Sequence, residues 1–466
     1  MLKFIIMMIL IFVFGFGQIN WEMETVDTSP GMVGYSNSLA FDINDIPHII
    51  YAITQVDTNL IMHAFKTDSY WQKETVDVCF AGGPYWGLPY YGVSLTIGDD
   101  NRLHSSFYRY DSLNNRTDLC YAYRDTLLWT IQVLDSMAGT ISWVPGYHTS
   151  IVLDTSGYPG IAYSYWNFTD SVQYIKYLHY NGVNWNSFIV EDSCVCWDYG
   201  VSLKIDKRNQ PHIAYYQLDP DSMKYVYYDN QLNTWVIAYH QDVVAVNSNA
   251  SLSLVLNSQN HPGIAYSFQG ESIVYSWFDG TFWYTDFVGG AGFWEVAIGL
   301  DLDSLENPHI AYTVEFNFWL EYAYKDTVWH LCGPHYGAMG NVCLKLNGNS
   351  NPHVSYDGGL LNYAWGSFAG VVEKQLSPRN KKCRIRVFPN ISSGVLNTEY
   401  TLPVKTKIEL SLYDIYGAKI KIFENSISLP GSYQKMIDIS SFSNGVYFIV
   451  LKQNNEQVAR KFLLIK

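Results

Sequence analysis

Short apolar runs separated by turn residues recur along the first 378 residues of the chain. The clearest pair is SLKID at 202–206 and PHIAY at 211–215, and related pairs precede and follow it. The runs are rich in β-branched and aromatic residues, and dipeptides such as Asn181-Gly182 and Asp279-Gly280 separate some of them. This pattern predicts β-strands joined by tight turns, and no run has the period of an amphipathic helix.

The paired runs form a repeat of seven units. In every unit, the proline position of the second run lies nine positions after the start of the first run. A third run follows, and a fourth run that begins at tryptophan completes most units. Four strands per unit predict an all-β fold with a seven-bladed β-propeller over 18–378, and an open solenoid is the alternative. The proline positions are 47, 103 (a leucine), 159, 211, 262, 308 and 352.

One strand-like segment lies outside the order of the repeat. The segment WEMETVD at 21–27 copies WQKETVD at 71–77, the fourth run of the first unit, yet it precedes every other run. Such a strand can complete the last blade and close a propeller ring, although segment 368–376 could take the same place. The repeat resembles the propeller-like repeats with a Pro-His-Ile-Ala-Tyr signature found in secreted bacterial proteins.

Composition and charge narrow the class of protein. The 466 residues are 48% hydrophobic, 16% aromatic and 15% charged, which is too apolar for a disordered chain. The net charge of −14 argues against nucleic acid as a partner. Residues 1–378 carry a net charge of −22 and residues 379–466 carry +8, so we expect two units with different tasks.

The first 17 residues, MLKFIIMMILIFVFGFG, have the pattern of a secretory signal peptide. Lys3 precedes an apolar run, and Gly15 and Gly17 occupy the small-residue positions of a cleavage site. The run is shorter than the roughly 20 residues of a membrane-spanning helix, which is the alternative. We therefore expect export and no transmembrane span after the signal is removed.

The spacing of the cysteines gives little support for disulfides or metal sites. Seven cysteines leave at least one without a partner in the chain, and the pair that export most favours as a disulfide is Cys332 with Cys343. Cys194 and Cys196 have no matching pair nearby, so we expect no metal site and no cofactor. Most of the cysteines are expected to act as small buried apolar residues.

After a linker at 379–383, residues 384–466 predict a small β-sandwich. The motifs VFPN at 387–390, LYDIYG at 412–417, GVYF at 445–448 and the final KFLLIK resemble the type A C-terminal sorting domain of the type IX secretion system. Ile391 departs from the second proline usual in that family, and a generic adhesive sandwich is the alternative. The motif residues are Pro389, Asn390, Gly394, Pro403, Tyr413, Asp414, Gly417, Gly445 and Tyr447.

The resemblance implies passage through the periplasm to the outer cell surface or the medium, with the type IX secretion machinery as a partner. It also implies that the domain is often removed, and that the remaining protein is then released or attached to the surface.

Residues that recur in most units are expected to serve the scaffold, because a single site needs only one copy. The histidine after the proline recurs five times, and we expect it to pack between strands rather than to bind metal. The acidic or amide residue that ends the first run is expected to cap the turn before the proline. Calcium at Asp42, Asn44 and Asp45 is the weaker alternative.

The unrepeated links between units carry the candidate site. They are rich in aromatic rings beside polar groups, which suits sugars because apolar sugar faces stack on rings. Packing of the links against one another is the alternative. The candidate ligand-binding residues are Tyr85, Trp86, Tyr91, Trp143, Tyr147, Trp197, Tyr199, Trp294 and Tyr336.

The function that we expect from the sequence is non-enzymatic binding of a glycan or a protein at the cell surface. The first alternative is a glycoside hydrolase or polysaccharide lyase that uses Asp198, Glu295, His148 and His335 of the same links. The second alternative is a structural surface protein. No nucleophile motif, metal-ligand spacing or phosphate loop accompanies the four candidate catalytic residues.

Overall fold

In the computed structural model, every regular element of the described residues is a β-strand, which confirms the expected all-β class. The chain divides into two compact units, Met1–Glu373 and Lys374–Lys466. The structure describes residues 19–466 except 56–57, 81–91, 112–113, 126–127, 139–147, 168–171, 195–199, 219–220, 243–250, 269–271, 291–296, 315–318, 335–336, 339, 369–383, 389–390, 403–405, 415–417, 429–430 and 454–455.

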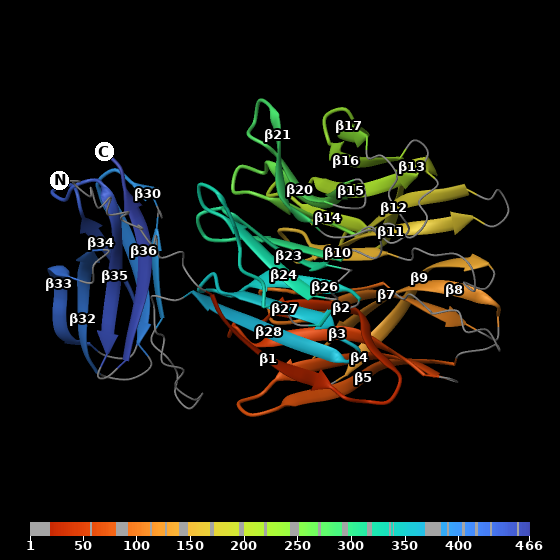
Figure 1. Ribbon diagram of the computed structural model, residues 1–466, viewed down its shortest axis with the longest axis horizontal. Helices are drawn as coiled ribbons and strands as arrows, with labels where there is room; N and C mark the ends of the chain where they lie inside the picture. Colours follow the sequence, from red (N-terminus) through yellow and green to blue (C-terminus); the bar gives the residue numbers. More distant parts are fainter. Residues whose placement is uncertain are drawn as a thin grey trace, which may run out of the picture. The chain divides into compact units, whose positions relative to one another are not determined.

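The described part of the first unit contains seven antiparallel four-stranded sheets, which we number 1 to 7 in chain order (Figure 1). Sheets 1 and 2 comprise β2 (Met32–Phe41), β3 (Pro47–Thr54), β4 (Thr58–Lys66) and β5 (Trp71–Phe80), then β6 (Val93–Ile97), β7 (Leu103–Asp111), β8 (Arg116–Arg124) and β9 (Trp129–Ala138). Sheets 3 and 4 comprise β10 (Thr149–Leu153), β11 (Pro159–Asn167), β12 (Val172–Tyr180) and β13 (Trp185–Cys194), then β14 (Val201–Ile205), β15 (Pro211–Leu218), β16 (Asp221–Asp229) and β17 (Thr234–Asp242).

The remaining three sheets repeat this order, and sheet 7 takes its fourth strand from the N-terminal part of the chain. Sheets 5 and 6 comprise β18 (Leu252–Leu256), β19 (Pro262–Phe268), β20 (Ser272–Phe278) and β21 (Trp283–Gly290), then β22 (Ile298–Leu302), β23 (Pro308–Val314), β24 (Trp319–Lys325) and β25 (Trp329–Leu331). Sheet 7 comprises β26 (Val342–Leu346), β27 (Pro352–Asp357), β28 (Leu361–Phe368) and β1 (Ile19–Asp27).

The first strands of the sheets form a ring. Each contacts the first strand of the next sheet, from β2 through β6 and onward to β26, and β26 returns to contact β2. Sheets that radiate from such a ring constitute a β-propeller.

Strand β1 is the outer strand of sheet 7. It pairs antiparallel with β28, and its register runs from Ile19 opposite Phe368 to Asp27 opposite Leu361. Figure 1 shows β1, in red, beside β28, in blue. Of the two segments that the sequence left open, the N-terminal one therefore supplies the fourth strand of sheet 7. In the competing segment 368–376, Phe368 ends β28 and the other residues lie outside the described residues.

Side-chain caps shape the turn between the first two strands of a sheet. In sheet 1, Asp42 Oδ1 accepts the backbone N–H groups of Asn44 and Ile46, both at 2.8 Å. Asp154, Asp206, Asn257, Asp303 and Asn347 make the same pair of bonds in their own turns. The expected capping role is confirmed, because these side chains satisfy amides that the tight turn leaves without backbone partners.

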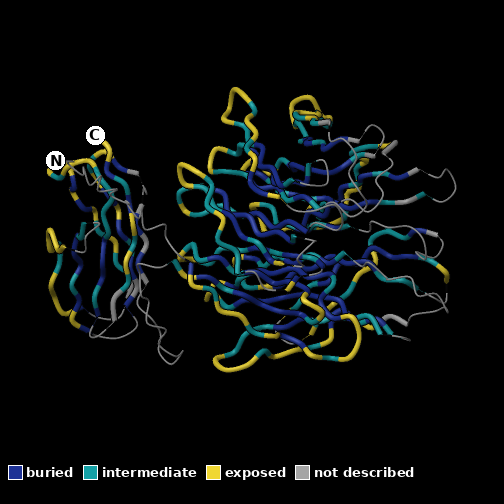
Figure 2. The backbone as a smooth tube through the Cα atoms, in the orientation of Figure 1, coloured by how far each residue is buried: buried dark blue, intermediate teal, exposed yellow. Residues whose placement is uncertain are grey.

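The core lies between neighbouring sheets, where the tyrosine of the PHIAY run is almost fully buried. In sheets 1, 3 and 4 its hydroxyl group reaches the outer strand of the preceding sheet, as where Tyr51 donates to Asp27 at 2.6 Å and Tyr163 donates to Asp135 at 2.7 Å. Buried residues follow the strands and exposed residues gather at the turns (Figure 2). These tyrosines are Tyr51, Tyr163, Tyr215, Tyr266, Tyr312 and Tyr356.

The second unit contains two sheets that share one apolar core, which includes the fully buried side chains of Leu396, Leu410 and Leu451. Its first sheet comprises β29 (Arg384–Phe388), β31 (Val395–Leu402) and β34 (Gly431–Asp438). Its second sheet comprises β30 (Ile391–Ser392), β36 (Glu456–Leu464), β35 (Gly445–Gln453), β32 (Thr406–Asp414) and β33 (Lys419–Ser428).

The disulfide that the sequence favoured does not form. Cys332 and Cys343 are both free thiols. Cys343 Sγ lies 3.3 Å from the backbone nitrogen of Leu39, whose N–H it accepts. Burial raises the pKa of the Cys332 thiol to about 12. The closeness of the two cysteines in the sequence therefore did not predict a disulfide, because the inner strand β26 directs Cys343 toward the neighbouring sheet 1.

Candidate functional site

Most residues of the predicted ligand face lie outside the described residues. The nine candidate ligand-binding aromatic residues all do so, as do the candidate catalytic residues Asp198, Glu295 and His335. Their contribution to a site stays a prediction.

His148 is the one described member of the predicted face. It is half-buried and directly precedes β10. Its backbone carbonyl accepts the N–H of Ser164 at 3.2 Å, and its own N–H points to Ser164 Oγ at 3.4 Å. These contacts place His148 on the scaffold of sheet 3.

The repeated histidines belong to the scaffold, as expected. His104 Nδ1 is hydrogen-bonded to the Tyr121 hydroxyl at 2.6 Å, and His212 pairs with Tyr225 in the same way at 2.5 Å. Gly263 replaces this histidine in sheet 5, and a Cβ atom there would stand 2.2 Å from the Tyr275 hydroxyl. The tyrosine thus fills the same space with or without its histidine partner.

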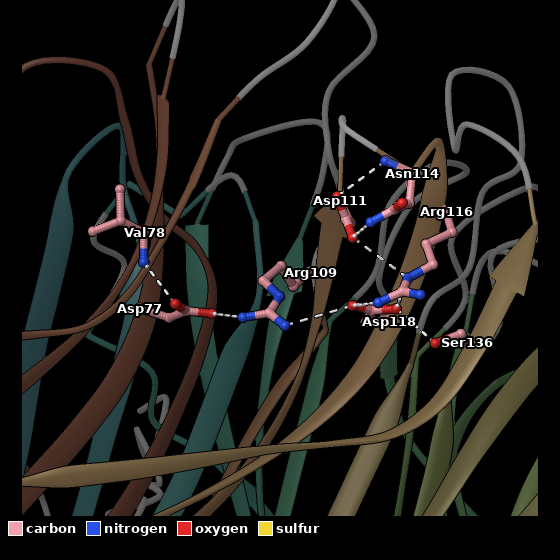
Figure 3. A network of polar contacts seen from close by, with 8 residues as sticks. All are labelled: Asp77, Val78, Arg109, Asp111, Asn114, Arg116, Asp118 and Ser136. Atoms are coloured by element: carbon pink, nitrogen blue, oxygen red, sulfur yellow. Dashed lines mark hydrogen bonds and ion pairs between the residues drawn. The ribbon is translucent and has the colours of Figure 1, made fainter.

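A network of ion pairs joins sheets 1 and 2 where other sheets use a tyrosine (Figure 3). Sheet 2 has Phe107 in the PHIAY position, so no hydroxyl is available to the outer strand of sheet 1. Arg109 bridges instead from Asp77, at 3.2 Å, to the fully buried Asp118, at 3.5 Å. Arg116 approaches Asp118 to 2.9 Å. Because these charges are paired with one another, the network serves to join the sheets.

The described residues also form an open groove between sheets 2 and 3, with a volume of about 990 Å³. One wall comes from the end of β6, the turn after it, β8 and β9, and the other from the equivalent parts of sheet 3. The strand β6 begins at Val93, directly after one of the predicted links, and ends at Ile97, beside the groove. The groove therefore lies at the opposite end of the inner strands from those links.

Five aromatic rings line the groove and contact one another in series. Tyr121 of sheet 2 meets the Trp185 ring of sheet 3 edge to face, with centroids 5.2 Å apart. Tyr180 lies 5.5 Å from Trp185 and 5.8 Å from Tyr158. Tyr123 lies 5.9 Å from Tyr121. The series crosses from one sheet to the next and offers an extended apolar surface beside polar groups.

Carboxylates surround these rings. Asp99, Asp100 and Asp125 are exposed in the lining, and Arg102 is the one cationic side chain among the lining residues. Arg102 lies 4.0 Å from Asp100 and 5.9 Å from the centroid of the Tyr123 ring. The groove is thus acidic at its edge and aromatic along its walls.

The histidine in the groove wall is uncharged at neutral pH. Burial lowers the pKa of His104 to about 4, with opposing smaller effects of Asp100 and Arg102. Burial also raises the pKa of its partner Tyr121 above the usual tyrosine value. Both side chains are neutral near pH 7, so the charge of the groove comes from its aspartates and Arg102.

The groove was not among the sites expected from the sequence, although departures from the repeat mark it. Leu103 replaces the repeated proline and Gly98 replaces the capping aspartate or asparagine in sheet 2. Gly160 replaces the repeated histidine in sheet 3, and Gly157 stands in its turn. A comparison of the repeats would therefore have singled out these two adjacent units, because four departures fall within them.

The described residues hold no group of three or more histidine, cysteine, aspartate or glutamate side chains placed to bind a metal ion. Within the same residues, no helix is both long and apolar enough to cross a membrane.

Residues 386–466 match the family described as "Secretion system C-terminal sorting domain". The C-terminal unit is therefore a type IX secretion sorting domain, as its motifs predicted. Such a domain implies export to the cell surface or the extracellular space and engagement of the secretion machinery.

Several motif residues of this domain have structural roles. Gly394 O accepts the N–H of Ile439 at 2.8 Å, and Asp414 Oδ1 accepts the N–H of Ala418 at 2.8 Å. The Tyr447 hydroxyl donates to Ser443 O at 2.8 Å. Pro389, Asn390, Pro403 and Gly417 lie outside the described residues.

Solved structures of similar shape include lectins. The SapL1 lectin, solved with α-methyl fucoside, has 12% identity and a TM-score of 0.44, over 60% of this chain and 95% of its own. The fungal Aleuria aurantia lectin, described as a six-bladed β-propeller, has 12% identity and a TM-score of 0.45, over 67% and 98%. A protein of unknown function from Dyadobacter fermentans has 8% identity and a TM-score of 0.42, over 74% and 98%.

These TM-scores lie below 0.5, so the likenesses carry no argument about the ligand of this chain. The described residues form seven four-stranded sheets, whereas the Aleuria aurantia lectin is described as six-bladed. A search of the curated proteins found no match.

Proposed function

We propose that the protein is an exported, non-enzymatic glycan-binding protein. In this proposal residues 1–17 are a signal peptide, 18–378 a seven-bladed propeller, 379–383 a linker and 384–466 the sorting domain. The sorting family match at 386–466 supports export. Seven four-stranded sheets with successive inner strands in contact support the blade number.

The groove between sheets 2 and 3 is the observation that carries the ligand class. Its volume of about 990 Å³ is at the upper end of the range for small-molecule sites. A sugar presents apolar C–H faces that stack on aromatic rings and hydroxyl groups that bond to carboxylates. The five rings and the neighbouring aspartates provide both kinds of contact in one place.

The test is a screen of the purified protein against glycans and polysaccharides, monitored for binding and for released products. We expect binding without products. Trp185→Ala removes the ring at the centre of the series and should weaken binding by at least about tenfold, on the scale of a buried aromatic contact. Trp235→Ala is the matched control. Trp235 lies near the start of β17, the outer strand of sheet 4, as Trp185 lies at the start of β13, and it does not line the groove.

Other outcomes would contradict the proposal. Released products would favour the enzyme alternative and direct attention to Asp198, Glu295, His148 and His335. Equal binding by both tryptophan variants would move the site away from the groove, with the predicted link residues, such as Trp86 and Trp197, as the next candidates. If no glycan binds, the alternatives are that the ligand is a protein or that the chain has a structural role at the cell surface.

A further inference from the structure

The turns between the first and second strands are joined around the ring by side-chain hydrogen bonds. At most junctions, the fourth residue of one turn has a positive φ angle and its side chain accepts a backbone N–H from the preceding turn. Asn101 accepts the N–H of Ile43 in this way, and Asn209 accepts that of Thr155. Ser258–Glu306, Ser304–Ser350 and Gly348–Asp45 are bridged in the same way. Between sheets 4 and 5 the bond runs in the other direction, because Asn260 Nδ2 donates to Asp206 Oδ2 at 3.3 Å.

Sheet 3 has a glycine at this position. Gly157 has a φ of +80°, like its counterparts, but it has no side chain to accept the N–H of Asp99 in sheet 2. A Cβ atom at Gly157 would meet nothing within 4 Å. Among the described residues, the turns of sheets 2 and 3 are therefore the pair of neighbouring turns that no side-chain hydrogen bond joins, and the groove opens at this junction.

The missing bridge leaves charged groups accessible at the inner end of the groove. Asp99 and Asp100 belong to the turn that faces Gly157, and Asp125 follows the end of β8 on the same wall. Arg102 offsets one of these charges, and the surrounding residues 1–378 carry a net charge of −22. An acidic edge repels anionic ligands and attracts cations, and aromatic faces also attract cations.

We propose that this groove, held open by Gly157, binds glycans that carry free amino groups in preference to neutral or acidic ones. The inference rests on the proposed glycan-binding function and names the ligand class of that site. The ammonium group contacts the aspartates and a ring face, and the sugar rings stack along the more exposed rings of Trp185, Tyr180 and Tyr158.

The test compares four probes by calorimetry with the full chain, near pH 6 so that the amines are protonated. The probes are a glucosamine oligomer, its N-acetylated counterpart of equal length, an oligogalacturonate and an oligolysine. We expect the glucosamine oligomer to bind about tenfold more tightly than the N-acetylated oligomer, since each exposed ion pair contributes only a few-fold. We expect the oligogalacturonate not to bind.

Three variants assign the effect to the groove. The double variant Asp99→Asn, Asp125→Asn should abolish the preference for free amines, whereas Asp68→Asn removes an exposed charge in the β4–β5 turn and should leave it unchanged. Gly157→Asn restores the bridging side chain without altering net charge, because asparagine tolerates positive φ. It should weaken binding of both glucosamine-based oligomers by about tenfold.

Each failure has a distinct meaning. Equal affinity for the two glucosamine-based oligomers would overturn the amino-group preference and leave the proposed function intact. Unchanged binding by Gly157→Asn would overturn the role of Gly157 in keeping the groove open. Oligolysine binding as tight as that of the glucosamine oligomer would assign the groove to a basic peptide. No glycan binding at all would overturn the proposed function as well.

Discussion

Position 343 shows how one side chain joins two sheets. A repeated serine in the first strand of a sheet accepts the N–H of a leucine or isoleucine in the first strand of the next sheet, as Ser38 does for Leu95 at 3.0 Å. Cys343 takes this place in sheet 7 and accepts the N–H of Leu39, at 3.3 Å, which joins sheet 7 to sheet 1. Further members of this set are Ser94, Ser150 and Ser202.

The first prediction follows from this contact. Cys343→Ser should keep the free energy of unfolding within about 0.5 kcal/mol, because a serine hydroxyl makes the same bond in other sheets. Cys343→Ala should cost about 1–3 kcal/mol, because the buried N–H of Leu39 loses its acceptor. Denaturant unfolding of both variants measures the difference. If both variants lost the same free energy of unfolding and a reductant also destabilised the native protein, a disulfide between Cys343 and Cys332 would be the better interpretation.

At the scale of single elements, the second and third strands of a sheet meet at the repeated histidine. Burial lowers the pKa of His48 and of His104 to about 4 and that of His353 to about 3, with the neighbouring His63 adding to the effect at His48. These side chains therefore stay neutral in the folded protein at a pH where an unfolded histidine is already charged.

The second prediction is a loss of stability in mild acid. The unfolded chain takes up protons at these histidines below about pH 6.5, whereas the folded chain does so only below about pH 4. The stabilisation is full above pH 6.5 and falls toward pH 4, by on the order of a few kcal/mol in total. Thermal unfolding between pH 7 and 4.5 measures this loss of stability. Most carboxylates stay ionised in this pH range, so the histidines dominate the change. His104→Gln should flatten part of the slope, and an unchanged slope would contradict the assignment.

At the scale of the whole molecule, strand β1 gives sheet 7 the same outer contacts that other sheets obtain from their own fourth strand. Glu24 of β1 accepts the indole N–H of Trp71 at 2.8 Å and pairs with Lys66 of sheet 1. Glu74 makes the same contact to Trp129 at 2.9 Å. The repeated sequence at 21–27 and 71–77 thus corresponds to a repeated junction between sheets.

The third prediction concerns this closure. Deleting residues 19–27 should lower the melting temperature by more than about 10 °C, because sheet 7 loses a strand and sheet 1 loses its neighbour. Glu24→Gln keeps the strand and weakens only the ion pair, so its effect should stay near about 1 kcal/mol. Differential scanning calorimetry separates the two. A deletion variant that melts like the full chain would mean that another segment closes the ring.

Much of the fold was accessible from the sequence because the repeat encodes local structure many times. Capping by Asp42 and its counterparts and strand starts at proline follow from short-range patterns that recur. The choice of the N-terminal segment over segment 368–376 as the closing strand needed the structure. The contact between Tyr121 and Trp185 did not follow, because 64 residues separate the two rings in the chain and sheet packing brings them together.

Two candidates were left for the strand that closes the ring, whereas the all-β class, the repeat and the sorting domain were already specified by patterns in the chain. These depend on local backbone preferences and on motifs that lie within one segment. The tertiary structure alone decided that Cys343 bonds across to Leu39 and that the groove opens between sheets 2 and 3. Both depend on how the side chains of one sheet meet those of the next, and no pattern within one repeat specifies that packing.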